Sequence, residues 1–154
     1  MKAICIIDTS ILLEILNVPN KSSKHKQIFA ELSNKLSNDE TIFVSMAAII
    51  ETGNHISQNG NGNVRRKTAE KFVNFIKEII ESDIPIKPIR YLVAIDVMRM
   101  LNKFPEYAMN EITLGDVNII LDWEYMCSMV KDRRVYIWAM DTHLQGYDQP
   151  ARTW

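Results

Sequence analysis

The apolar residues of this chain follow two alternating patterns. Short runs rich in β-branched residues occupy 2–7, 41–45 and 135–140, and residues at helical spacing follow the first two closely. A short continuous apolar run predicts a strand that is buried on both faces, whereas apolar residues three or four apart predict an amphipathic helix. Strands that alternate with helices predict a mainly parallel sheet, so we expect the α/β fold class.

The same patterns predict helices over 9–16, 24–36, 46–57, 64–82, 90–102 and 113–129. Two prolines limit 84–89 to a short edge strand, and Pro105 predicts a loop over 104–112. Residues 58–63, with the sequence QNGNGN, predict a flexible loop, and 146–154 predict a terminal loop with at most one short strand. Because no repeat or linker interrupts the chain, we expect one domain over residues 1–154.

Composition narrows the class of protein. The chain has 154 residues, of which 47% are hydrophobic and 24% charged, and its net charge is −1. These values are typical of a globular protein, and no apolar run approaches the roughly 20 residues of a membrane-spanning helix. Cys5 and Cys127 lie in apolar runs, so we expect reduced core residues of a cytoplasmic protein. Because the net charge is only −1, any nucleic-acid binding must depend on local basic clusters.

Acidic residues stand where the predicted parallel strands end. Asp8 directly follows the first strand, Asp141 follows the last, and Glu51 lies in the second turn of the helix after 41–45. Parallel strands share a carboxyl edge, which is where α/β proteins bind their ligands. We therefore expect these three side chains to converge.

Two of the acids lie on helix faces that should be buried. Glu51 comes one turn after two alanines, and Asp116 comes one turn before two isoleucines. A buried carboxylate is costly unless it is paired or bound to a metal ion. The sequence therefore predicts that Asp8, Glu51, Asp116 and Asp141 form one divalent-metal site.

Oxygen ligands without His or Cys favour hard cations, here Mg²⁺ or Mn²⁺. Such an ion lowers the pKa of a bound water and neutralises phosphate oxygens, which suits hydrolysis of a phosphodiester. The alternative for Asp8 and Asp141 is to cap a following helix, and Asp116 could form a capping box with Thr113. Glu51 has no comparable alternative, because it lies inside a helix.

The ordered motifs of the chain resemble those of the PIN-domain nucleases, and especially the VapC-type ribonuclease toxins of bacterial and archaeal toxin–antitoxin pairs. The matching stretches are IIDTSIL at 6–12, VS at 44–45 leading through AA at 47–48 to Glu51, LGD at 114–116, and IWAMDT at 137–142.

This resemblance implies a three-layer α/β/α sandwich with a mainly parallel sheet of four to five strands. It also implies cleavage of single-stranded RNA that depends on Mg²⁺ or Mn²⁺, with the four acids as catalytic metal ligands. Thr9 or Ser10 matches the hydroxyl that follows the first acid in the family. It would contact the metal ligands and not the ion itself, with helix capping as the alternative. A cognate antitoxin is an expected partner, and apolar residues on the helix from Asp116 would suit a homodimer.

Several basic side chains are candidates for contact with an RNA backbone. His55 and His143 lie close in sequence to two of the acids, and Arg65, Arg66 and Lys67 follow the flexible loop. The alternative for each is an ordinary solvated surface residue.

Three other acids, Asp148, Asp122 and Asp96, are weaker candidates for the metal site. Asp148 is either a further metal ligand or a plain loop acid. Asp122 follows Asp116 by six residues, about 240° around a helix, so it should face away from the site. Asp96 is expected to be a helix-surface acid.

Two other functions compete with the nuclease. A non-catalytic PIN-like binding or scaffold module would keep the fold, but the presence of all four acids argues against it. A Mg²⁺-dependent phosphatase is disfavoured because Asp8-Thr9-Ser10 lacks the second aspartate, two residues on, that an aspartyl-phosphate mechanism uses. The sequence therefore predicts a cytoplasmic, metal-dependent endoribonuclease.

Overall fold

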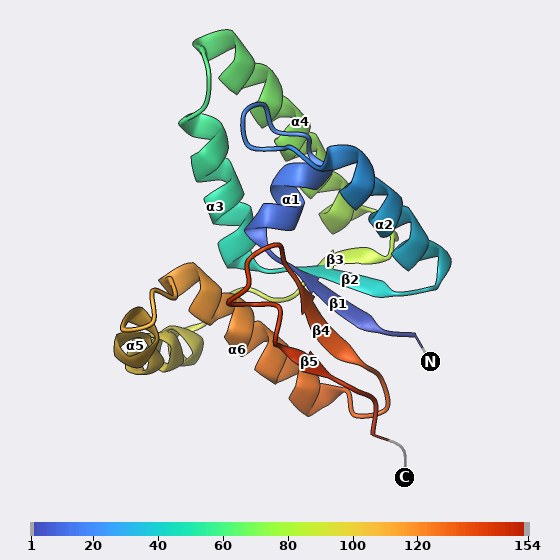
Figure 1. The fold of residues 1–154 in the computed structure, drawn as a ribbon, viewed down its shortest axis with the longest axis vertical. Helices are drawn as coiled ribbons and strands as arrows, with labels where there is room; N and C mark the ends of the chain where they lie inside the picture. Colours follow the sequence, from blue (N-terminus) through green and yellow to red (C-terminus); the bar gives the residue numbers. More distant parts are fainter. Residues whose placement is uncertain (1, 153–154) are drawn as a thin grey trace.

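A five-stranded sheet organises the computed structural model, which describes residues 2–152 (Figure 1). Its strands are β1 (Ile4–Ile7), β2 (Thr41–Val44), β3 (Ile86–Pro88), β4 (Val135–Trp138) and β5 (Asp148–Gln149), in the order β3-β2-β1-β4-β5. The first four are parallel, and β5 pairs antiparallel with β4. The predicted α/β class and mainly parallel sheet are therefore confirmed. Residues 153–154 of the predicted terminal loop lie outside the described residues.

Six helices are assigned within this part of the chain: α1 (Thr9–Ile15), α2 (His25–Ser37), α3 (Met46–Ser57), α4 (Gly62–Glu81), α5 (Ala94–Ala108) and α6 (Leu114–Met129). In Figure 1, α1 to α4 lie on one side of the sheet and α5 and α6 on the other, which gives three layers. None of these helices combines the length and the apolar character that crossing a bilayer requires.

Side chains of β1 alternate between two hydrophobic cores. Cys5 and Ile7 pack with residues of α1, α2 and α4, whereas Ile4 and Ile6 pack with residues of α6. All four side chains are at most 1% exposed. Burial on both faces is the reason that the strand is apolar throughout instead of alternating with polar residues. Cys5 and Cys127 are buried and unpaired, as expected.

The register of the sheet brings three strand ends to one edge. Ile7 lies opposite both Val44 of β2 and Trp138 of β4. The next residue, Asp8, continues this alignment by donating its backbone N–H to the Trp138 carbonyl at 3.1 Å. The N-termini of α1 and α3 and the segment after β4 therefore meet at the carboxyl edge.

The prediction for the region around Pro105 was wrong. We expected a helix over 90–102 and a loop over 104–112, but α5 begins at Ala94 and continues through Pro105 to Ala108. Proline cannot donate a hydrogen bond to the carbonyl four residues earlier, which belongs to Leu101. Leu101 and Pro105 are both exposed, so the helix takes the proline on a side that solvent reaches.

Glu14 is a charged residue that the fold encloses completely. It is 0% exposed and accepts hydrogen bonds from Ser22 Oγ at 2.6 Å, Ser23 N at 3.0 Å and Lys24 N at 2.9 Å. Burial acts to raise the pKa of Glu14, but these hydrogen bonds outweigh it and hold the pKa below its ordinary value of 4.5. Glu14 thereby fixes the turn that leads into α2.

We expect Glu14→Ala to destabilise the protein by about 1–3 kcal/mol at pH 7, because it removes the charged acceptor of three hydrogen bonds that hold the turn before α2. Since the folded pKa is depressed, this stabilisation is present above pH 4.5 and is lost as the pH falls through the folded pKa. Urea unfolding at pH 7 and pH 3 measures both effects, with the exposed Glu81→Ala as the control. An equal loss for Glu14→Ala at the two pH values would contradict this account.

Candidate metal centre

Asp8 caps α1 and is also the most deeply buried of the four predicted metal ligands. It is 5% exposed, and its Oδ2 accepts hydrogen bonds from Ser10 N at 3.3 Å and Ser10 Oγ at 2.7 Å. Burial raises the pKa of Asp8; the Ser10 hydrogen bonds oppose this shift, and the charge of Asp116 adds to it. Ser10 Oγ also accepts the backbone N–H of Met140 at 3.0 Å, which ties the segment after β4 to the start of α1.

Glu51 is half-buried and is held by the other hydroxyl of α1. Thr9, which is 6% exposed, donates from Oγ1 to Glu51 Oε2 at 2.9 Å. Burial raises the pKa of Glu51 in spite of this hydrogen bond, and the charges of Asp116 and then Asp8 raise it further. Thr9 and Ser10 thus each bind one of the acids.

Asp116 forms the predicted capping box at the start of α6. Its Oδ2 accepts Thr113 N at 3.0 Å and Thr113 Oγ1 at 2.8 Å, and Thr113 Oγ1 in turn accepts the Asp116 N–H at 3.1 Å. Asp8 and Asp116 both use Oδ2 for capping, and within residues 2–152 neither shows a hydrogen bond to Oδ1. Capping is therefore compatible with a second role for each carboxylate.

Three of the predicted ligands come within electrostatic reach of one another. Asp116 raises the pKa of both Asp8 and Glu51, and Asp8 raises that of Glu51. Crowded carboxylate oxygens are the donors that Mg²⁺ and Mn²⁺ prefer, and Mg²⁺ needs only one or two of them because it keeps several waters. The donor chemistry therefore fits such an ion, but among the described residues no three His, Cys, Asp or Glu side chains already lie close enough together to hold one.

Asp141 is exposed, whereas the other three acids are buried or half-buried. Its Oδ1 accepts the backbone N–H of His143 at 2.9 Å, and its charge is not among the largest causes of the pKa shifts of Asp8 and Glu51. Its backbone is nevertheless close to α1, because the neighbouring Met140 is bonded to Ser10. Its place among the metal ligands stays a prediction.

The remaining acids are bound elsewhere. Asp148 pairs with Arg134 through two contacts of 2.9 and 2.7 Å at the start of β4, away from the carboxyl edge. Asp96 was wrongly expected on the surface: it is 3% exposed and lies 3.0 Å from Arg90. Asp122 also faces Arg90, at 3.6 Å, and burial raises its pKa to about 7 although Arg90 opposes the shift.

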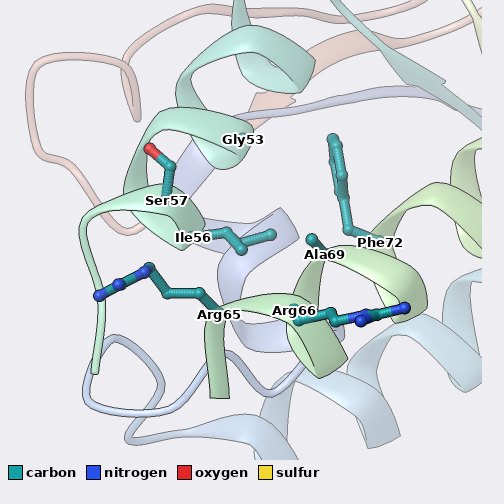
Figure 2. Close-up of a pocket in the computed structure, with 7 residues that line it drawn as sticks. All are labelled: Gly53, Ile56, Ser57, Arg65, Arg66, Ala69 and Phe72. Atoms are coloured by element: carbon teal, nitrogen blue, oxygen red, sulfur yellow. The ribbon is translucent and has the colours of Figure 1, made fainter. Parts of the chain in front are cut away.

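Four of the five predicted RNA-binding residues lie beyond Glu51 along α3 and α4, and His143 follows β4. Arg65 and Arg66 line a cavity of about 460 Å³ between these helices, and Figure 2 shows the two side chains extending in different directions from α4. The rest of its lining is mainly apolar: Gly53, Ile56, Ser57, Ala69 and Phe72. His55 lies near enough to Glu51 to lower its pKa slightly, whereas Lys67 and His143 are exposed.

Two residues of α6, Gly115 and Asn118, were given no role by the sequence, although Gly115 lies in the matching stretch LGD. A Cβ atom added to Gly115 would overlap the carboxylate of Glu51. Asn118 is 2% exposed, and its Oδ1 accepts the backbone N–H of Ala47 at 3.2 Å. The available signal was a polar residue inside the apolar run VNIIL, which is the same kind of conflict that identified Glu51.

We expect Asp8→Asn to raise the melting temperature of the chelator-treated protein at pH 7. Asparagine caps a helix as well as aspartate does, and it removes a charge whose pKa the fold raises above its ordinary value of 3.8. A charge of this kind opposes folding at pH 7, so the gain should shrink as the pH falls through the raised folded pKa and should be absent below 3.8. Thermal unfolding at pH 7 and pH 3 tests this, with the exposed Asp132→Asn as the control, and a lower melting temperature at pH 7 would contradict it.

Comparison with known proteins rests on structure, because no protein-family model and no curated protein sequence matches the chain. FitAcB from Neisseria gonorrhoeae superimposes with a TM-score of 0.61 at 14% identity, over 93% of this chain and 91% of that one. Mycobacterium tuberculosis VapC20, a toxin that cleaves the sarcin-ricin loop, superimposes with a TM-score of 0.56 at 12% identity, over 89% and 91%. The chain thus has the fold of the PIN-domain toxins, as its motifs predicted.

Proposed function

We propose that this protein is a metal-dependent endoribonuclease that acts in the cytoplasm as the toxin of a toxin–antitoxin pair. The observation that carries the proposal is the approach of Asp8, Glu51 and Asp116 at the carboxyl edge of a PIN-type sheet. RNA as the substrate is supported by the shared fold with VapC20, which is described as a toxin that cleaves the sarcin-ricin loop.

The four acids are proposed to hold Mg²⁺ or Mn²⁺ and to be the catalytic residues. When bound, such an ion neutralises charge on the phosphate and lowers the pKa of water at the site. Asp8, Glu51 and Asp116 would provide carboxylate oxygens from the buried side of the site, and Asp141 would provide a fourth carboxylate from the exposed side. Thr9 and Ser10 hold two of these carboxylates in place through their hydroxyl groups.

The proposed RNA path continues from Glu51 over α3 and the start of α4. His55, Arg65, Arg66 and Lys67 would contact phosphates on this side, and His143 would do so beside Asp141. His55 shares the Glu51 face of α3, four residues further along, and Arg65 and Arg66 lie beside the end of the same helix, which supports this path.

The proposed protein partners are a cognate antitoxin and a second copy of the chain. Most apolar residues of α6, where the sequence placed a dimer surface, are buried. Support for a homodimer comes instead from large apolar side chains on α5, at its C-cap and at the end of α6. They are Ile95, Met98, Leu101, Met109 and Met129, each at least 50% exposed.

The first experiment is to incubate a pool of structured and single-stranded RNAs with the protein plus Mn²⁺, with chelator, and with Asp8→Asn. We expect cleavage that requires Mn²⁺ and that falls by more than about 100-fold in Asp8→Asn, since loss of a ligand should exceed the 10–100-fold typical of an outer-shell partner. Mapping the cut ends would give the preferred sequence directly.

The control for this experiment is Asp132→Asn, which changes an exposed carboxylate of the turn before β4 and should cleave normally. Equal cleavage by wild type and Asp8→Asn would show a contaminating nuclease. An absence of cleavage at every metal concentration would instead favour the scaffold alternative. Rapid Mg²⁺-dependent release of phosphate from a small phosphomonoester would favour the phosphatase.

The RNA path predicts that Arg65→Ala combined with Arg66→Ala weakens binding of a single-stranded RNA to the uncleaving Asp8→Asn protein. Each lost phosphate contact should reduce the slope of log K against log salt by about 1. Binding titrations at several salt concentrations measure this slope, with the exposed Lys131→Ala at the opposite edge of the sheet as the control. An unchanged slope would exclude this path.

A further inference from the structure

The two helices that carry Glu51 and Asp116 touch at two points. On α3, Ala47 and Glu51 are four residues apart and therefore share a face. On α6, Gly115 and Asn118 are three residues apart and also share a face. Asn118 lies against Ala47, and Gly115 lies against Glu51, so the two faces meet in antiparallel order.

The first point is a cap that α3 receives from another helix. The first amide groups of a helix have no partner within it. Ser45 Oγ accepts the N–H of Ala48 at 3.1 Å, and Asn118 Oδ1 accepts the N–H of Ala47 at 3.2 Å. Because Asn118 is 2% exposed, its side-chain oxygen depends on this contact, which ties the start of α3 to α6.

The second point depends on the absence of a side chain. Gly115 lies inside the first turn of α6 and does not have the positive φ that would require glycine. Alanine is normally the better helix residue. The structural reason for glycine is space, because a Cβ at this position would overlap the Glu51 carboxylate.

We propose that Asn118 and Gly115 are positioning residues that set the register of α3 against α6 and so hold Glu51 beside Asp116. The inference rests on the proposed metal site, because the spacing of its acids is what the two residues control. A slip of one helical turn, about 5.4 Å, would carry Glu51 away from Asp116 and leave the Ala47 N–H unpaired. Neither residue is assigned contact with RNA or with the ion.

Gly115→Ala separates positioning from stability. We expect the variant to melt at the same or a higher temperature in chelator, because alanine favours the helix, while Mn²⁺ binding measured by calorimetry weakens about tenfold or more. In a Glu51→Ala background the same substitution should cause no further loss, because the overlapping carboxylate is gone. A purely structural glycine would show the opposite, with lower stability and unchanged affinity.

Asn118→Leu tests the other point with a side chain of similar volume that cannot accept a hydrogen bond. We expect weaker Mn²⁺ binding, whereas Asn34→Leu on the exposed surface of α2 should bind normally. If wild type binds Mn²⁺ and neither Gly115→Ala nor Asn118→Leu binds it more weakly, the inference is overturned.

A readout that does not need metal keeps this inference separate from the proposed function. Crystal structures of the wild-type and Gly115→Ala proteins would show where the Glu51 carboxylate lies relative to Asp116. A displaced carboxylate supports the positioning role even if wild type binds no Mn²⁺, a result that would overturn the metal site alone. An unmoved carboxylate overturns the positioning role.

Discussion

Parallel pairing of β1 with both β2 and β4 is the constraint on which the rest of the structure depends. Because Ile7 lies level with Val44 and Trp138, all three strands end at the same height. The segments after these strands therefore lie at one edge: Asp8 at the start of α1, the N-terminus of α3, and the residues leading to Asp141. The helices on the two faces of the sheet then only have to bring Glu51 and Asp116 toward that edge.

The cost of this arrangement is a set of acids held close together and partly out of water. The pKa values of Asp8 and Glu51 are raised first by burial and then by neighbouring charge, so the metal-free fold carries repulsion. Hydroxyl groups from Thr9 and Ser10 offset part of it. Capping uses only one oxygen of Asp8 and one of Asp116, so the local structural role does not exclude a ligand role.

The sequence was informative wherever a local conflict marked a residue. Asp8, Glu51 and Asp116 were predicted because carboxylates followed a strand or interrupted an apolar helix face, and in the structure Asp116 is near enough to raise the pKa of the other two. Glu14 and Asn118 are equally buried polar residues in apolar runs, yet their partners come from a turn and from another helix. Sequence spacing alone does not reveal such partners, so these residues were overlooked.

The sequence by itself determined the α/β class, the succession of strands and helices along the chain and the placement of acids after strands, because hydrophobic periodicity and helix capping are local effects. Tertiary structure alone decided three further features: the burial of Asp96 against Arg90, the passage of α5 through Pro105, and the need for glycine at 115. Each depends on what surrounds the residue in the folded protein. Asp96 meets the Arg90 guanidinium, Pro105 faces solvent, and Gly115 meets the Glu51 carboxylate. Such neighbours are set by the packing of helices on the sheet, which no local pattern encodes.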